Sequence, residues 1–88
     1  MYYVYLLKNP KSDQIYIGYT GDLRRRYAEH QKLERHKGWR LKYYEAYSNR
    51  EDAMERERKL KSYGSSLHGL KARIRRSLDD FQDLEWAG

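Results

Sequence analysis

The sequence predicts a small α/β domain of the α+β kind, in which a three-stranded, mostly antiparallel sheet is flanked by about three helices. Three observations support this fold class. Residues 2–8 form a nearly continuous apolar and Tyr-rich run, which is typical of a central strand. A turn-forming cluster at residues 9–13 separates this run from a second strand-like segment. Later segments repeat apolar residues at helical spacing, which gives the order ββαβαα within one domain of 88 residues.

The first half of the chain is expected to form a hairpin followed by a helix. The opening run pairs with residues 14–19, because only a short turn separates them. Thr20 or Asp22 can cap a helix that ends near Gln31. The residues of this helix that would face the core are four apart, namely Leu23 and Tyr27.

The second half is expected to add one strand and two helices. Residues 32–38 are polar and predict a loop, whereas residues 39–47 are rich in aromatic residues and predict the strand. Asn49, with Asp52 three residues later, resembles a capping box and starts a helix that stops at Gly64.

Ser65 or Ser66 can cap a last helix, whose apolar stripe falls at helical spacings: Leu67, Leu70, Ile74 and Leu78. We therefore place the domain at residues 1–78 and treat residues 79–88, which are acidic, as a C-terminal tail. Phe81, Leu84 and Trp86 could anchor this tail against the basic domain, where it would compete with a polyanion; alternatively the tail continues the helix or frays.

Charge is unevenly distributed along the chain. Residues 1–78 contain all 19 Lys and Arg and nine of the 13 acidic residues, a net charge of +10, whereas the whole chain carries +6. Such a body favours a polyanionic partner, DNA more than RNA, although a solubilising surface is the plain alternative. The absence of Cys excludes thiolate metal sites, and the absence of a long apolar run and of a signal-peptide pattern gives the expectation of a cytoplasmic protein with no membrane partner.

Two tyrosine motifs lie on the first two predicted strands, Tyr3-Val4-Tyr5 and Tyr16-Ile17-Gly18. Arg26 and His30 follow, four residues apart on one face of the first helix. Taken alone, each of these residues is more often an ordinary strand or surface residue than a functional one. Their order and spacing make them a candidate site.

These motifs resemble the GIY-YIG nuclease family, and most closely its short, single-domain bacterial type, which is similar to the nuclease module of the bacterial excision-repair endonuclease. The resemblance covers about residues 2–75. The family's required arginine falls at Arg26, ten residues after Tyr16. Its metal-binding glutamate stands four residues after a small residue and four before a lysine, which selects Glu57 over Glu55.

The resemblance implies a metal-dependent DNA endonuclease that selects DNA structure rather than sequence, with a role in DNA repair. Glu57 would hold one Mg²⁺ or Mn²⁺, Arg26 would bind a phosphate oxygen, and Tyr5 would act as general base with its pKa lowered by its neighbours. Tyr16 would orient water or phosphate, and His30 would position Tyr5 or replace it as base. The basic residues expected to contact nucleic acid are Arg24, Arg25, Lys59, Lys61, Lys71, Arg73, Arg75 and Arg76.

Two departures from the family pattern keep a second hypothesis open. Tyr3 replaces a glycine, and Gly69 stands where many family nucleases carry an asparagine. The alternative is a nucleic-acid-binding module that cuts poorly or only with a protein partner that supplies specificity; a purely structural adaptor fits the basic body less well. His36 and His68 are expected to be surface residues, and Tyr43, Tyr44 and Tyr47 to be strand and core residues.

Overall fold

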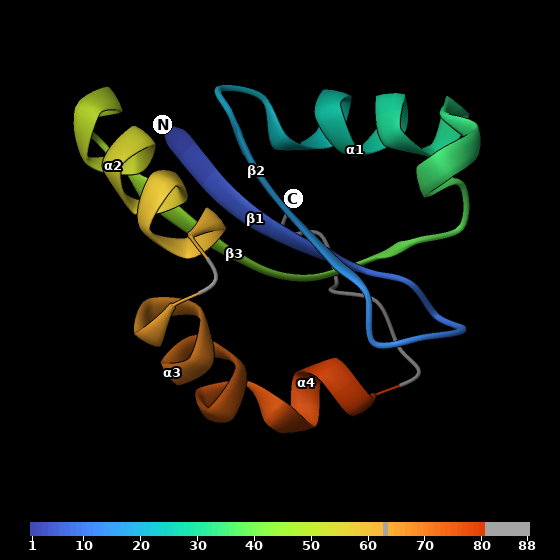
Figure 1. Ribbon diagram of the computed structural model, residues 1–88. Helices are drawn as coiled ribbons and strands as arrows, with labels where there is room; N and C mark the ends of the chain where they lie inside the picture. Colours follow the sequence, from blue (N-terminus) through green and yellow to red (C-terminus); the bar gives the residue numbers. More distant parts are fainter. Residues whose placement is uncertain (63, 81–88) are drawn as a thin grey trace.

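The computed structural model describes residues 1–62 and 64–80 (Figure 1). Within them it contains three strands, four α-helices and one 3₁₀ helix: β1 (Tyr2–Lys8), β2 (Ile15–Thr20), α1 (Leu23–Lys32), η1 (Glu34–His36), β3 (Arg40–Tyr47), α2 (Arg50–Lys61), α3 (Ser65–Arg73) and α4 (Arg75–Asp79). This confirms the α+β class and the expected order of strands and helices.

The three strands form one antiparallel sheet in the order β2-β1-β3, so the first strand is central. Tyr5 of β1 lies opposite Gly18 of β2 and opposite Tyr44 of β3. A register shift between Leu6 and Leu7 interrupts the pairing of β1 with β3. The hairpin predicted from the short turn is therefore confirmed, and β1 acquires a neighbour on each side.

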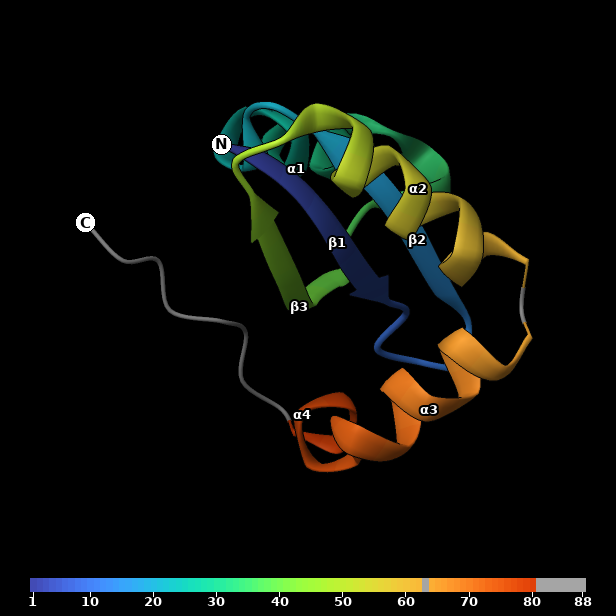
Figure 2. The same cartoon turned by 90° about the vertical axis from the view of Figure 1, so that its left-hand side faces the viewer.

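Helices cover both faces of the sheet. Helix α1 lies on the opposite side of the sheet from α3 and α4 in both views (Figures 1 and 2). The face toward α2 and α3 carries an aliphatic cluster that includes Val4, Leu6 and Leu60, each no more than 1% exposed. The face toward α1 carries a second cluster built on Tyr5 and Leu7. Alternate residues of β1 thus serve two different cores.

The first two α-helices begin at side-chain caps. The Asp22 carboxylate accepts a hydrogen bond from the Arg25 backbone N–H at 3.1 Å, so of the two expected candidates Asp22 is the cap. The Asn49 side chain accepts from the backbone of Glu51 and Asp52, which confirms the predicted start of α2.

The C-terminal helical region differs from the prediction. Helix α2 ends at Lys61, and Gly64 is the cap of α3 with no side-chain hydrogen bond, so the expected serine cap is wrong. The expected single helix is split into α3 and α4 at Ile74, whose backbone leaves the helical region. The apolar stripe is preserved across the break, because Leu67, Leu70 and Leu78 are all buried.

Helix α4 is held to the sheet by Lys42, a residue of β3 that is 4% exposed and whose Nζ donates to the Asp80 carbonyl at 2.6 Å. The expected contacts of Phe81, Leu84 and Trp86 lie outside the described residues. Among the described residues, none of the helices has the length and apolar character needed to cross a bilayer.

Candidate active site

Tyr5 lies at the centre of the sheet face that α1 covers. Its side chain is 1% exposed, and its ring lies directly over Gly18 on the neighbouring strand. A Cβ atom at position 18 would overlap the Cζ and Oη atoms of Tyr5. The glycine of the second tyrosine motif is therefore required by the ring of the first motif.

Tyr16 shares this face because it pairs with Leu7, two residues along β1 from Tyr5. The centroids of the Tyr5 and Tyr16 rings are 6.2 Å apart. The two predicted tyrosines therefore lie side by side on adjacent strands.

Arg26 approaches both tyrosines from α1. Its guanidinium hydrogen-bonds the Tyr5 hydroxyl and also interacts with Tyr16, and its Nη1 lies 3.0 Å from Glu29 Oε1. The carboxylate of Glu29, followed by the two phenols, raises the pKa of Arg26 further above its ordinary value. The side chain stays 39% exposed, so a phosphate can reach the guanidinium.

His30 completes this group from the last turn of α1. Its Nε2 shares a hydrogen bond of 2.7 Å with the Tyr5 hydroxyl, and its ring centroid is 5.0 Å from that of Tyr16. The other ring nitrogen, Nδ1, lies 3.0 Å from Nδ1 of His36. Tyr5, Tyr16, Arg26 and His30 thus form one connected cluster.

The expected location of His36 was wrong. Residues 34–36 form η1 instead of an open loop, and this turn brings His36 inward to 7% exposure. Its ring centroid lies 4.7 Å from Tyr16 and 4.8 Å from Trp39. His68, by contrast, is exposed on α3, as expected.

The expected lowering of the Tyr5 pKa was also wrong. Burial raises the pKa of Tyr5 to about 12, because an ionised phenolate would lose its solvation, and this outweighs the opposing effect of the Arg26 guanidinium. At neutral pH Tyr5 is a neutral phenol. It can donate and accept hydrogen bonds but is a poor free-standing base.

The two histidines are held neutral by the same environment. Burial, assisted by Arg26, lowers the pKa of His30 to about 4. Burial and the neighbouring Arg35 also lower the pKa of His36. At neutral pH each ring therefore has one protonated nitrogen and one acceptor nitrogen.

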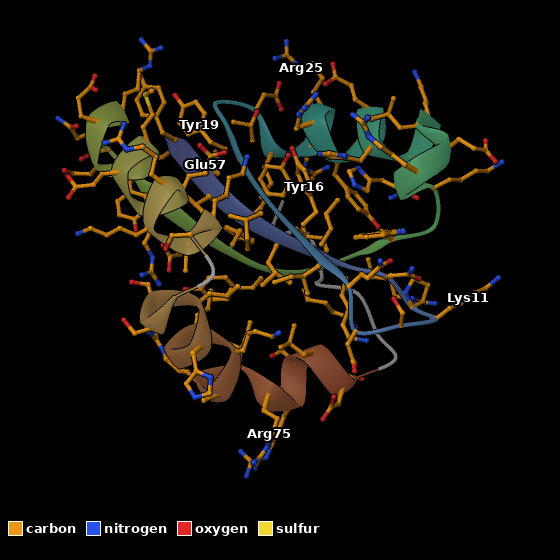
Figure 3. The ribbon with its side chains drawn as sticks, in the orientation of Figure 1. Lys11, Tyr16, Tyr19, Arg25, Glu57 and Arg75 are labelled. Carbon is orange, nitrogen blue, oxygen red and sulfur yellow. The ribbon has the colours of Figure 1, made fainter. Side chains whose placement is uncertain are left out.

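Glu57 reaches the cluster through a lysine. Helix α2 packs on the aliphatic face of the sheet, but the labelled Glu57 side chain lies on the side of α2 that faces β2 (Figure 3). The Glu57 carboxylate is 22% exposed and lies 3.2 Å from Lys61 Nζ. The same ammonium stands 5.6 Å from the centroid of the Tyr16 ring. Lys61 therefore connects Glu57 to Tyr16 across the edge of the sheet.

A family model for the GIY-YIG catalytic domain matches residues 1–71 of this chain. The chain belongs to the GIY-YIG family. The matched part of this GIY-YIG domain contains the Tyr5 cluster and Glu57, and ends within α3. Comparisons with curated proteins and with solved structures found no match.

The GIY-YIG family generally uses a divalent metal ion. Among the described residues, no group of three or more His, Asp or Glu side chains could hold one. The donor chemistry nevertheless fits Mg²⁺, which is commonly held by one or two carboxylates together with waters and substrate phosphates. Glu57 offers such a carboxylate, and its exposed partner Lys61 can move aside.

The basic residues predicted to contact nucleic acid do not form one surface. Arg25 on α1 and Arg75 on α4 point to opposite ends of the molecule (Figure 3). Arg24, Arg25 and Lys61 lie on the helices that carry the site, α1 and α2, as does Lys59. The others lie on α3 and α4, across the sheet from α1: Lys71, Arg73, Arg75 and Arg76.

Proposed function

We propose that this protein is a metal-dependent endonuclease that hydrolyses phosphodiester bonds in DNA. The observation that carries the proposal is the convergence of Tyr5, Tyr16, Arg26 and His30 on one sheet face, with Glu57 linked to Tyr16 through Lys61. Membership of a family of catalytic domains supports it. A structural core alone would not require a guanidinium hydrogen-bonded to a buried phenol.

Each group in this cluster suits one requirement of phosphodiester hydrolysis. Arg26 can share its guanidinium between Glu29 and a non-bridging phosphate oxygen, and so stabilise the charge that builds on phosphorus in the transition state. The Tyr5 and Tyr16 hydroxyls can orient the attacking water. Their rings are fixed by packing, so little reorganisation is needed when the substrate binds.

Glu57 is the residue that would hold the divalent ion. A bound Mg²⁺ or Mn²⁺ would neutralise phosphate charge and stabilise the leaving oxygen. The Glu57 carboxylate is only partly exposed and already accepts from an ammonium, which indicates a position that favours a cation.

DNA structure rather than base sequence is the proposed basis of substrate selection. The cations nearest the cluster are Arg24, Arg25 and Lys61, and side chains of this kind contact phosphates, which carry no sequence information. We favour DNA over RNA, with nicked or branched forms as the first substrates to test. A protein partner could add specificity that a domain of this size lacks.

Glu57→Gln, with Glu55→Gln as its matched control, tests the proposal. Both carboxylates lie on α2 and pair with a lysine four residues on, at 3.2 Å and 3.1 Å. Pure protein is incubated with nicked, branched and single-stranded DNA in Mg²⁺ or Mn²⁺. We expect Glu57→Gln to lower kcat by roughly 10³-fold and Glu55→Gln to leave it within about 2-fold. Equal activity of the two variants, or no cleavage by the wild type, contradicts the proposal.

The second candidate is a nucleic-acid-binding module that does not cut on its own, and Gly69 favours it. Gly69 is exposed on α3, and a Cβ there would meet no atom within 4 Å. A side chain is therefore sterically allowed at the position where many family nucleases carry asparagine. If Gly69→Asn gains cleavage that the wild type lacks, while DNA affinity stays the same, the binding module is the correct description of this chain.

A further inference from the structure

A pair of buried imidazoles continues the active-site cluster away from the substrate side. The hydrogen-bonded chain runs from the Tyr5 hydroxyl to His30 Nε2 over 2.7 Å, and from His30 Nδ1 to His36 Nδ1 over 3.0 Å. His30 is 1% exposed and His36 is 7% exposed. Positioning Tyr5 requires only the first bond, so the second bond needs its own explanation.

Two nitrogens that face each other at this distance need one proton between them. Both rings are neutral at neutral pH, so one Nδ1 donates and the other accepts. If His30 Nδ1–H donates to His36, then His30 Nε2 is free to accept the proton of Tyr5. His36 then carries its own proton on Nε2. In this arrangement every bond of the chain has one donor and one acceptor.

The charged groups around His36 favour the neutral ring. Arg35, next to it in sequence, and Arg26 on α1 both disfavour a positive imidazole, and burial adds to their effect. Lys71 on α3 and Asp13 in the β1–β2 turn line the pocket on which His36 also borders. An extra proton on His36 would therefore leave quickly.

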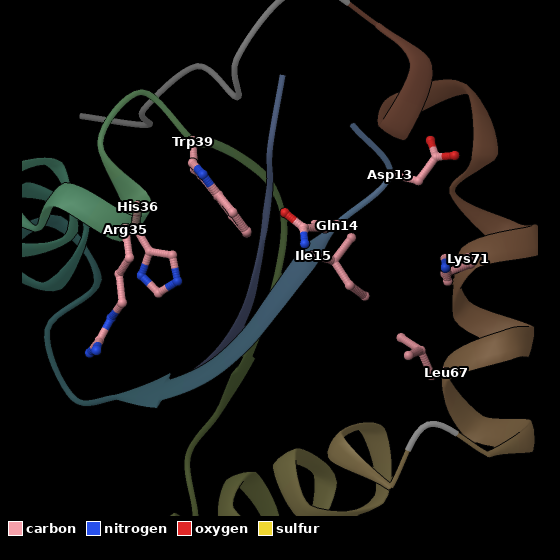
Figure 4. Close-up of a pocket in the computed structure, with 8 residues that line it drawn as sticks. All are labelled: Asp13, Gln14, Ile15, Arg35, His36, Trp39, Leu67 and Lys71. Atoms are coloured by element: carbon pink, nitrogen blue, oxygen red, sulfur yellow. The ribbon is translucent and has the colours of Figure 1, made fainter. Parts of the chain in front are cut away.

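That pocket has a volume of about 530 Å³ and is also lined by Trp39 and Ile15. Figure 4 shows His36 at one side of it, next to Arg35 and Trp39. Water that enters such a pocket can receive a proton from the outer nitrogen of His36.

We propose that His36 is the exit residue of a proton relay that runs from Tyr5 through His30 to this pocket. The proposal rests on the proposed hydrolytic function and explains how a neutral phenol can serve where a base is needed. His36 is a positioning and relay residue, since its ring contacts His30 and Tyr16 and not the reacting atoms.

In the relay, one proton enters as one leaves. The attacking water loses a proton to the Tyr5 oxygen as its own oxygen bonds to phosphorus. Tyr5 passes its original proton to His30 Nε2, and His30 passes its Nδ1 proton to His36 Nδ1. His36 releases its Nε2 proton to water in the pocket. No free phenolate forms, and the resting arrangement returns when the protons shift back between turnovers.

Two substitutions at position 36 separate relay from packing. His36→Leu fills the space but offers no acceptor. His36→Asn offers an amide oxygen to His30 Nδ1–H but cannot pass a proton on. His68→Asn is the matched control, because His68 is exposed on α3. We expect kcat for DNA cleavage to fall by roughly 10- to 100-fold in both position-36 variants and by less than about 2-fold in the control, with KM unchanged.

Full activity of either position-36 variant overturns the relay. Activity in His36→Asn but not in His36→Leu would reduce His36 to a residue that only orients His30, and so also overturns it. Circular dichroism and urea unfolding show whether the variants are folded, and a variant that does not fold is replaced by His36→Gln.

A second readout does not depend on cleavage. The chain has three histidines, so the ¹⁵N spectrum of the imidazoles is simple to assign. We expect His30 in the wild type to carry its proton on Nδ1 and to move it to Nε2 in His36→Leu. A wild-type His30 protonated on Nε2 overturns the relay. If the wild type cleaves no DNA, the proposed function fails, whereas the expected spectrum would still establish the proton arrangement.

Discussion

The two faces of the sheet are filled by different chemistry. On the face toward α2 and α3 the core is aliphatic, with Leu6 and Leu60 no more than 1% exposed. On the face toward α1 the corresponding depth is occupied by a phenol and an imidazole, Tyr5 and His30. The aliphatic face gains free energy from burial alone, whereas the other face must also satisfy every hydrogen bond that it removes from water. Stability and chemistry are thus separated by one strand thickness.

The aliphatic face has one polar exception, and it is fully paired. The Glu45 carboxylate accepts hydrogen bonds from Tyr43 at 2.7 Å, from Tyr47 at 2.5 Å and from Arg56 at 3.0 Å. Burial opposes ionisation of Glu45, but these donors hold its pKa below the usual range. A carboxylate with this many partners has no free position for a ligand. This network is structural, in contrast to the chain of histidines.

The largest effect is expected from adjacent leucines that face opposite sides. Leu6 and Leu7 are both 0% exposed, and Leu7 pairs with Tyr16. Either Leu→Ala change should lower the free energy of unfolding by about 3 to 5 kcal/mol, measured by urea unfolding. Only Leu7→Ala should also lower kcat, by roughly 10-fold, because Tyr16 loses its support. Equal kcat values at a temperature where both variants are folded would remove the functional distinction between the faces.

The pH dependence of stability should come from the histidine side. The pKa of His30 is about 4 in the folded protein and about 6.5 when unfolded, so between these values the unfolded state binds more protons. The stabilisation is complete above about pH 6.5 and falls by about 3 kcal/mol as the pH approaches 4.

Urea unfolding between about pH 7.5 and pH 4.5 measures this loss above the range where Glu45 titrates. His30→Asn should flatten the curve, whereas Leu6→Ala should shift it by a constant amount. An unchanged slope in His30→Asn would assign the pH dependence to other groups.

A smaller effect is expected where the two tyrosine motifs meet. Gly18→Ala places a methyl group against the Tyr5 ring, whereas Gly21→Ala meets no atom within 4 Å. We expect Gly18→Ala to cost about 1 to 3 kcal/mol of stability and to reduce kcat, because the Tyr5 hydroxyl must move. Gly21→Ala should change stability by less than about 0.5 kcal/mol. Thermal unfolding of both variants checks this, and two equal melting temperatures would argue against the close contact.

The smallest expected effect concerns the outer surfaces of the two sides. Arg25→Gln on α1 should lower the log–log salt slope of DNA binding by about 0.9, the value for one lost phosphate contact. Arg75→Gln on α4 should leave the slope nearly unchanged. Fluorescence anisotropy over a series of salt concentrations measures both. Equal reductions would mean that DNA contacts both sides of the molecule.

The sequence predicted the fold and the inner site because both depend on local patterns. The alternation along β1 and the spacing of Tyr5 and Tyr16 follow from strand geometry, and Arg26 and His30 share a helix face. His36 could not be predicted in this way, because its burial depends on a 3₁₀ turn and on its neighbours Tyr16 and Trp39. The signal was present in part, since Gly38 has a φ of 82° and its backbone N–H donates to Gln31, which turns the chain back toward α1.

The pKa of Tyr5 was beyond the sequence for a different reason. The types of neighbour were predicted correctly, but the sign of the shift depends on burial, which exceeds the effect of Arg26. The split between α3 and α4 at Ile74 likewise has no marker, since that segment contains neither glycine nor proline. Helix propensity favoured one continuous helix, and packing of Leu78 against the aliphatic cluster favoured the break.

The contact between Gly18 and the Tyr5 ring also bears on how this domain can change over generations. A ring at position 5 permits only a hydrogen at position 18, and a side chain at position 18 would require a smaller residue at position 5. Neither position can drift alone without passing through a weakened intermediate. The two motifs by which such a sequence is noticed are therefore a single inherited unit, written in two places because the chain folds back on itself.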